Sequence, residues 1–368
     1  MALTLHGTVA DNTAVLSRPN AKPLIINGDM QVTQRATSVT GQTGSGYIVC
    51  DRWLTDIGTG GTWTVSQAAD APTGSGFRSS TKYDCTTANG SLSAGSFMTH
   101  QMRFEGQDLQ VFKKGTSSAE NFTVSFWVKS AKTGTYIVEL EDMDNTRQVS
   151  QAYTISSADT WEKKVLSFPA DTTGAFGDDN AASLHMFFWL VAGSTYSSGT
   201  LSTTWTSKTN ANRAVGQVNL ADSTNNDWYI TGVQLEVGDF DANSIAPFQH
   251  ESFGDSLRRC QRYFQRIWEK NSCYFAMGFM YSSSIGIGIS DLPVTMRTSP
   301  TLSVNSNSNQ FTFYRAGAAD TVSTFALNSA APTRASITNT NEMSGTAGQA
   351  GGWYATGANG FVNLVAEL

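Results

Sequence analysis

Charged side chains are scarce in this chain. Only 15% of its 368 residues are Asp, Glu, Lys or Arg, and the formal net charge is -6. A protein that holds nucleic acid needs a clustered basic surface to displace counterions from phosphates. The composition therefore argues against a nucleic-acid partner. The local exception is a group of four arginines within residues 258–266, which suits a solvated or carboxylate-paired helix flank better than phosphate contacts.

Cysteine, histidine and long apolar runs are also scarce. Four isolated histidines and four cysteines without a CxxC motif make a zinc site unexpected; the cysteines are Cys50, Cys85, Cys260 and Cys273. There is no P-loop and no Gly-x-Ser-x-Gly elbow, so the sequence gives little support to catalysis. No segment approaches the ~20 apolar residues that span a bilayer, and residues 1–12 lack the pattern of a signal peptide. We expect a protein that is made in a cytoplasm and does not insert into a membrane.

Glycine, serine, threonine and asparagine are abundant, as in turn-rich β structure. From Leu24 to about Pro247 the pattern is one apolar alternation after another, with Gly, Asn and Asp breaks. In FTVSFWVKS the apolar set is Phe122, Val124, Phe126 and Val128, whereas LHMFFWLVAG is continuously apolar, as a central strand would be. Eight or so such runs predict a β-sandwich.

A junction follows between Trp228 and Phe264. Alternation through Val237 predicts a half-buried strand, with Tyr229, Val233 and Leu235 on one face. After Pro247 the period becomes helical, and a single apolar stripe is formed by Phe253, Leu257, Cys260, Phe264 and Ile267. Strand patterns then resume from Asn271 to the end.

These patterns divide the chain into four parts. Residues 1–22 are too short for a domain, 23–250 form the sandwich, 251–270 form a connector helix and 271–368 form a second β domain. The leader is compatible with a disordered end or with a peptide that docks on another protein by strand addition. The predicted fold class is all-β: a sandwich, a short amphipathic helix and a C-terminal β-sandwich.

Several segments, taken in order, resemble tailed-phage virion fibre proteins whose central module is a carbohydrate-binding-like jelly roll. They are LIINGDMQVTQR (24–35), DRW (51–53), TVSFWVKSAKTGTY (123–136), YTISSADTWEKK (153–164), VQLEVG with APF and LRRCQRYF (233–264), and LPVTMRTSP (292–300). The resemblance implies a jelly roll for the first domain and a place in the virion. It also implies a tail fibre or adhesin subunit that binds a host-surface glycan without catalysis.

Two other functions remain open. The chain is also compatible with a capsid fibre or decoration protein of the same build, and with a glycan-degrading tailspike-like enzyme. In each case residues 1–22 would contact the portal, tail or capsid. The four-three spacing of the apolar stripe is that of a helical bundle seam and predicts a homotrimer. Two heptads are too few for a free-standing coiled coil, so the β domains should supply most of the interface.

Aromatic residues offer candidates for sugar binding. Most tryptophans lie in strand patterns and are expected in the core: Trp53, Trp127, Trp161, Trp189 and Trp228. Tyr196 and Trp205 instead lie in a long Ser, Thr and Asn loop at 193–213. An exposed ring among hydroxyls and amides can stack on a sugar while its neighbours bond the sugar hydroxyls. For Trp205 we favour the alternative that the ring plugs the edge of the sandwich or forms a subunit contact, because the resemblance suggests that this loop is shared across the family.

Acidic residues offer two further candidates. Glu139 and Glu141 share one face of a strand and loosely resemble the paired carboxylates of laminarinase-type jelly rolls, although the order of Glu and Asp departs from that motif. An exposed strand face or a cation site explains them equally well, and we expect no catalysis. Asn27 and Asp29 resemble the entry of jelly rolls that hold a structural calcium, since their oxygens suit that ion.

Overall fold

The computed structural model describes residues 23–269, 273–304, 311–355 and 361–368. Within it the chain divides into two compact units: the first runs to Phe253 and includes Leu368, and the second is Gly254–Glu367. The predicted leader, 1–22, lies outside the described residues. None of the helices in the described ranges is long and apolar enough to cross a membrane.

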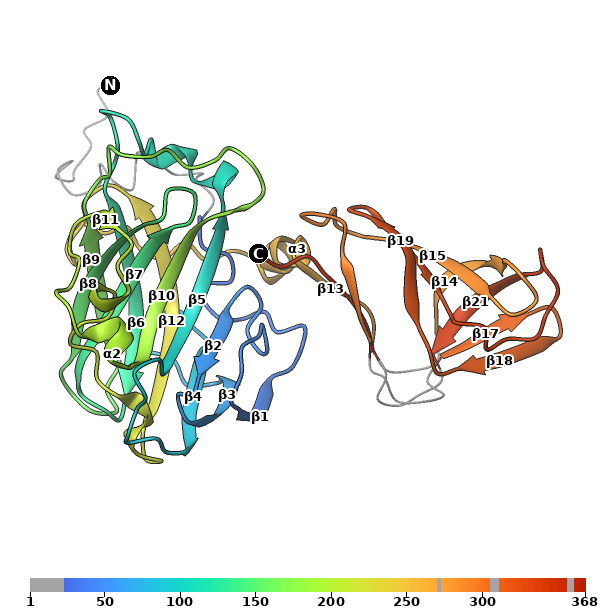
Figure 1. Cartoon of the computed structure of the whole chain (residues 1–368), viewed down its shortest axis with the longest axis horizontal. Helices are drawn as coiled ribbons and strands as arrows, with labels where there is room; N and C mark the ends of the chain where they lie inside the picture. The colour runs from blue at the N-terminus through green and yellow to red at the C-terminus, as the bar shows by residue number, and fades with distance from the viewer. Residues whose placement is uncertain (1–22, 270–272, 305–310, 356–360) are drawn as a thin grey trace, which may run out of the picture. The chain divides into compact units, whose positions relative to one another are not determined.

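The first unit is a jelly-roll sandwich of two six-stranded antiparallel sheets, between which the chain crosses repeatedly (Figure 1). Sheet A has the order β1 (Ser38–Gln42), β3 (Thr62–Ala68), β4 (Ser80–Thr87), β12 (Asp227–Val237), β6 (Phe122–Ser130), β9 (Glu162–Phe168). Sheet B has the order β11 (Thr206–Ser207), β8 (Arg147–Ile155), β7 (Gly134–Asp142), β10 (Ala182–Ala192), β5 (Phe97–Glu105), β2 (Leu54–Gly58).

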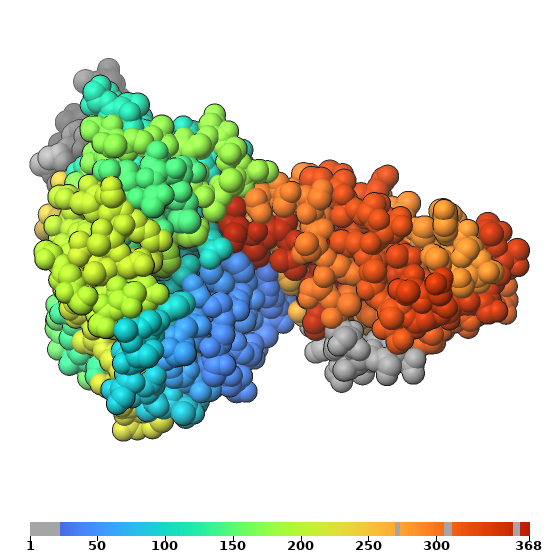
Figure 2. Space-filling model, viewed as in Figure 1, coloured from blue at the N-terminus to red at the C-terminus, as the bar shows by residue number. Residues whose placement is uncertain are grey.

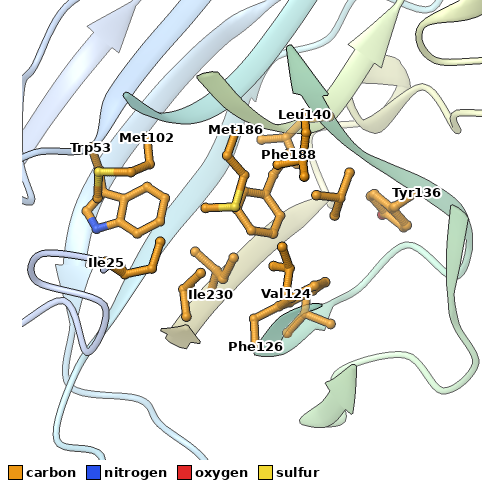
Figure 3. Packing of buried hydrophobic residues seen from close by; sticks show 14 of the residues in the cluster. Ile25, Trp53, Met102, Val124, Phe126, Tyr136, Leu140, Met186, Phe188 and Ile230 are labelled. Carbon is orange, nitrogen blue, oxygen red and sulfur yellow. The ribbon is translucent and has the colours of Figure 1, made fainter. Parts of the chain in front are cut away.

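The core lies between these sheets. Met186, Phe188 and Leu140 of sheet B point toward Ile230, Val124 and Phe126 of sheet A (Figure 3). The predicted apolar set of β6 is fully buried, and the continuously apolar β10 is a central strand between β7 and β5. Segments distant in sequence lie side by side on the surface of this unit, where atoms of different colours adjoin (Figure 2).

Strand β12 departs from its predicted pattern. It is buried on both faces, and its core-facing residues change phase: Trp228 and Ile230 come before the change, and Val233, Leu235 and Val237 after it. The pairing with β6 shifts between Thr231 and Gln234, where Gly232 has φ +63°. A β-bulge inserts one residue and so reverses the faces that follow it. The prediction that one face carries Tyr229, Val233 and Leu235 is therefore wrong for Tyr229.

Short helices lie in the connections of the first unit. They are η2 (Gly106–Asp108), η3 (Gln110–Phe112), α2 (Ser194–Ser197), η4 (Asn210–Asn212) and η5 (Leu220–Asp222).

The second unit is also a β-sandwich. Its smaller sheet has the order β13 (Phe264–Glu269), β22 (Phe361–Val365), β16 (Thr301–Val304). The larger, sheet D, has the order β18 (Ala318–Val322), β17 (Phe311–Arg315), β21 (Ala350–Ala355), β14 (Tyr274–Met280), β15 (Gly286–Asp291), β20 (Arg334–Thr338), β19 (Ala326–Ala331). Trp268 and Val362 of the smaller sheet share a core with Phe313 and Trp353 of sheet D. The predicted all-β class, with a sandwich in each domain, is confirmed.

The connector helix is shorter than predicted. α3 spans Phe253–Gln261, and the chain then enters β13, so Phe264 and Ile267 lie on a strand and the helical stripe ends at Cys260. Phe264 is buried, and Ile267 packs against the core of the second unit. The single helical stripe was therefore a wrong prediction beyond Cys260. A contact between copies at these five residues stays a prediction, and the most exposed of them is Phe253, at 55%.

Candidate functional site

The outer face of sheet A carries partly exposed aromatic residues among polar ones. Because side chains alternate along a strand, the burial of Phe126 and Val128 in β6 turns Ser125, Trp127 and Lys129 outward. Trp127 pairs with Lys163 of β9 on one side and with Thr231 of β12 on the other. Trp127 is half-buried and Lys163 is exposed.

A hollow of about 200 Å³ opens beside Trp127. It is lined by Ser75, Phe77, Ser125, Trp127, Lys163, Gly232, Gln234 and Phe248. Two segments outside the sheet form its wall. The Phe77 and Phe248 rings meet edge to face at 5.0 Å, and the Gln234 Nε2 donates to the Ala246 carbonyl at 2.9 Å, which fixes the segment that carries Phe248.

Gly232 has two functions in this hollow. Its positive φ forms the bulge of β12, and a Cβ at this position would lie 2.5 Å from the Phe77 Cζ. Only glycine therefore lets the Phe77 ring lie this close to the strand.

Further aromatic residues continue along the same face. The Lys129 ammonium lies 4.1 Å from the centre of the Tyr229 ring and 5.6 Å from that of Trp161. The Trp161 Nε1 donates to the Asp70 carboxylate at 3.0 Å, and Lys129 pairs with that carboxylate. These contacts hold Trp161 and Tyr229 in place next to the strand that carries Trp127.

This arrangement has the chemistry that sugar recognition requires. A ring face can stack on the C–H groups of a sugar, while hydroxyl, amide and ammonium groups bond its hydroxyls. The hollow is smaller than the roughly 300–1,000 Å³ of sites for drug-sized ligands, and so suits a single sugar residue. Trp127 and Trp161 were expected in the core, but both are half-buried on the outer face, so this site was not predicted. The signal was available, since Trp127 falls on the polar phase of β6.

A larger hollow of about 310 Å³ lies elsewhere in the first unit. It is lined by Gln31, Gln67, Ala68, Ala69, Arg78, Ser79 and Phe253. Its single aromatic ring belongs to Phe253, the first residue of α3, whereas three aromatic rings line the hollow at Trp127. We therefore place the candidate site at Trp127.

The two rings predicted to bind sugar lie elsewhere. Trp205 is only 8% exposed; its Nε1 donates to the Pro169 carbonyl at 2.8 Å, and its ring packs on Phe122. Tyr196 is half-buried and packs against Phe97 and Trp189 on the outer face of sheet B. Trp205 is therefore not the exposed ring that sugar binding would need. Its burial agrees with the favoured alternative, a ring that packs into the sandwich, because this long polar loop folds back onto it.

Glu139 and Glu141 do share a face, but it is not exposed. Arg213 bonds Glu139 at 2.8 Å and Glu141 at 2.9 Å, while the Trp189 Nε1 donates to Glu139 at 2.8 Å and Lys208 pairs with Glu141. Burial raises the pKa of Glu139, and the Arg213 charge opposes this rise. Both carboxylates are buried and held in ion pairs. This arrangement suits a structural role, because neither carboxylate faces a position that a substrate could occupy.

The two candidate calcium ligands are engaged in the backbone turn around them. The Asn27 Oδ1 accepts from the Val32 amide at 2.9 Å, and its Nδ2 donates to the carbonyls of Val32 and Asp51. Asp29 accepts from the Gln31 side chain at 2.6 Å. Since the Asn27 oxygen faces an amide hydrogen, the pair does not fit a calcium ion. Nowhere in the described ranges do three or more His, Cys, Asp or Glu gather in a way that could hold a metal.

Comparison with known proteins identifies no family. The sequence matches no family model and no curated protein. Solved structures with a similar arrangement include the enzymatically active domain of tailspike protein 4 from bacteriophage CBA120, at 14% identity over 58% of this chain and 21% of that one, with a TM-score of 0.29. They also include a family 61 carbohydrate-binding module in complex with β-1,4-galactotriose, at 7% identity over 59% of this chain and 99% of that one, with a TM-score of 0.30.

A third is the family 11 carbohydrate-binding module from Clostridium thermocellum in complex with a β-1,3-1,4-mixed-linked tetrasaccharide. It is 12% identical over 55% of this chain and 97% of that one, with a TM-score of 0.27. This chain spans about a fifth of the tailspike's length. At these scores the likenesses carry no argument about the ligand of this chain, which depends on its own geometry.

Proposed function

We propose that this chain is a glycan-binding, non-catalytic subunit of a tailed-phage fibre, and that it attaches the virion to a host-surface glycan. The observation that carries the glycan part is the half-buried Trp127 ring beside a hollow lined by hydroxyl, amide and ammonium groups. The virion part is supported by the ordered sequence resemblance between residues 24 and 300. Binding without turnover is favoured because Arg213 and Lys208 hold Glu139 and Glu141 in ion pairs.

Substitution of Trp127 tests the glycan part. In Trp127→Ala the stacking face is lost, and we expect glycan-array signals and adsorption to host cells to fall at least about tenfold, since stacked aromatic contacts contribute on the order of 1 kcal/mol or more. The melting temperature should change little, because the ring is not part of the core. Trp205→Ala is the matched control: it should lower the melting temperature and, while folded, still bind. Unchanged binding by Trp127→Ala would show that the site lies elsewhere.

Imaging of intact particles tests the virion part. We expect a label on this chain to decorate the tail. Decoration of the head would favour the capsid-fibre alternative, and absence from purified particles would contradict a virion protein of either kind. Deletion of residues 2–20 should give a folded protein that no longer enters particles, because the leader is the proposed contact with the portal, tail or capsid.

The remaining part of the proposal is that the chain assembles into a homo-oligomer. The bundle-like spacing of the apolar residues in 253–267 suggests a trimer. Assembly is supported by the outer face of sheet D, which exposes large apolar side chains: Tyr274 52%, Met277 62%, Phe279 43%, Tyr281 65%, Ile289 42% and Tyr314 38%. The rings of Tyr274, Tyr314 and Tyr354 stand at 67–85° to one another and pack edge to face. An apolar face of this kind suits a protein partner. Its exposed charges, Asp291 and Arg334, pair with each other, so a second copy of this chain could pack its own apolar side chains against it.

A further inference from the structure

Lys163 differs from the other lysines in the described part of the chain. Every other described lysine has a carboxylate within 4.0 Å: Lys82, Lys113, Lys114, Lys129, Lys132, Lys164 and Lys208. Lys163 has no carboxylate partner among the described residues. It lies on β9 directly opposite Trp127 and lines the hollow.

The surroundings of Lys163 leave its charge uncompensated. The neighbouring carboxylates are already paired, Glu162 with Lys164 and Asp70 with Lys129. The rings of Trp127, Phe77 and Phe248 line the same hollow and surround the ammonium side of it with apolar surface. Burial accordingly lowers the pKa of Lys163, although the side chain reaches solvent. An anion beside this ammonium would gain from a partly desolvated charge that no protein group offsets.

We propose that the hollow selects a sugar residue that carries an anionic substituent, with its ring against Trp127 and its anionic group paired with Lys163. The proposal deepens the glycan-binding function and depends on it. A carboxylate, as in uronic or sialic acids, and a sulfate or phosphate ester share the required chemistry. The spacing supports such a ligand, because residues directly opposite on paired strands lie about 5 Å apart, so a ring on Trp127 brings its substituent within reach of Lys163.

The test compares the full-length protein with three variants on an array of neutral, carboxylated, sulfated and phosphorylated glycans. The variants are Trp127→Ala, Lys163→Met and, as an exposed lysine outside the hollow, Lys113→Met. We expect the wild-type signals to fall mainly on anionic glycans. Lys163→Met should weaken these at least tenfold, which corresponds to about 1.4 kcal/mol, and should retain any neutral signals. Lys113→Met should match the wild type.

A matched pair of ligands then isolates the charge. For a carboxylated ligand, calorimetry compares the acid with its neutral methyl ester; for a sulfated or phosphorylated one, it compares the ester with the unmodified sugar. Wild-type affinity for the charged member should exceed that for the neutral member and should weaken with added salt, whereas Lys163→Met should bind both alike. Thermal melting of Lys163→Met checks that the variant is folded.

The outcomes separate the two proposals. Binding confined to neutral glycans, or unchanged binding of anionic ones by Lys163→Met, would overturn the selectivity for anionic sugars and leave glycan binding standing. Binding that is insensitive to Trp127→Ala, or no binding to any class on the array, would overturn both. The carboxylated, sulfated and phosphorylated arms identify which anionic group is preferred.

Discussion

The Lys114 ammonium occupies a position where a bound metal cation could otherwise lie. This ammonium is buried and lies among four oxygens. It donates to Asp142 Oδ2 at 2.5 Å and to the carbonyls of Thr173 and Gly174 at 2.9 and 2.8 Å, and it forms an ion pair with Asp171 Oδ2 at 3.0 Å. Carboxylate and carbonyl oxygens converging on one point are what calcium requires. The sequence suggested a cation at Asn27 and Asp29. In the structure such a set of oxygens lies instead around the Lys114 ammonium.

Removing this ammonium should destabilise the first unit strongly. Lys114→Ala leaves the buried Asp142 carboxylate without a counter-charge, whereas Asp171 keeps its ion pair with Arg147. Loss of one partner of a buried ion pair typically costs about 3–5 kcal/mol and should lower the melting temperature by on the order of 10 °C. Lys113→Ala, at the exposed neighbour, should change it little. We also expect millimolar CaCl₂ to raise the melting temperature of Lys114→Ala but not that of the wild type. An equal, small effect of both alanine variants would contradict this account.

His100 places a titratable group inside the core. It stacks on Trp53 with ring centres 4.5 Å apart, and its Nδ1 lies 2.8 Å from the Tyr83 hydroxyl, which is 2.7 Å from the Thr55 hydroxyl. Burial lowers the pKa of His100 to about 3, and burial with nearby cationic side chains lowers that of His185 to about 3 as well. Both histidines are therefore neutral in the folded protein at neutral pH.

The pH dependence of stability follows from these two histidines. Below about pH 6.5 the unfolded chain takes up protons at these residues that the folded chain does not, so their contribution to stability is complete above that pH and is lost as the pH falls toward 3. We expect His100→Phe to flatten the fall in unfolding free energy between pH 6.5 and 4, by up to about 1.4 kcal/mol per pH unit. Urea titrations across that range measure it. An unchanged slope in His100→Phe would show that His100 is already protonated when folded.

At the scale of elements, the bulge in β12 couples the fold to the site. Gly232→Ala would combine two costs: strain from the positive φ, and a Cβ 2.5 Å from the Phe77 ring that forms the wall of the hollow. Gly41→Ala separates them, because Gly41 has φ +69° but nothing within 4 Å of its Cβ. We expect Gly41→Ala to cost about 1 kcal/mol and Gly232→Ala more, with weakened glycan binding. Equal losses of stability, with binding intact, would show that Phe77 moves aside without consequence.

The sequence predicts a strand or helix correctly where the interactions that determine its conformation leave a pattern within the element itself. The alternation in β6 and the apolar run of β10 predict strands correctly, because burial on one or both faces leaves its period in the sequence. β13 was predicted as helix because Phe264 and Ile267 continue the spacing of α3. Their strand conformation comes from pairing with β22, about 100 residues away, as in Phe264 with Val365. Such a distant pairing leaves no local pattern.

The same limit applies to the candidate site. Trp127 can be assigned to the outer face of a strand from β6 alone, since it alternates with Phe126 and Val128. The hollow beside it cannot be predicted, because Phe77 and Phe248 reach it from segments about 50 and 120 residues away. Trp205 became a sugar-binding candidate for the opposite reason. Its polar neighbours suggest exposure, but a loop can turn one ring inward while its hydroxyls face water.

At the scale of the whole molecule, each unit carries its own core and presents a different kind of surface. The first unit exposes rings among polar and charged groups, whereas the second exposes six large apolar side chains on one sheet face. Aromatic rings with polar partners suit a sugar, and a predominantly apolar face suits protein. We infer that the first unit recognises the ligand and the second contributes to assembly.

The size of the apolar face supports an interface between copies. If about half of each of six side chains of roughly 200 Å² is exposed, the face offers about 600 Å² per copy, or about 1,200 Å² for a pair. This value lies at the lower end of the range for specific interfaces. A larger interface would need the further contribution predicted for Phe253 and Leu257 of α3.

A pair of methionine variants tests this assignment. Met277 lies on the face and is 62% exposed, and Met143 is 41% exposed in the first unit. Met277→Glu would bring like charges together where copies meet, so light scattering coupled to size exclusion should show an oligomer for the wild type and monomers for this variant at micromolar concentration. Met143→Glu should keep the wild-type mass, and three copies would agree with the predicted trimer. A monomeric wild type would contradict assembly altogether, whereas an oligomer that survives Met277→Glu would place the contact away from sheet D.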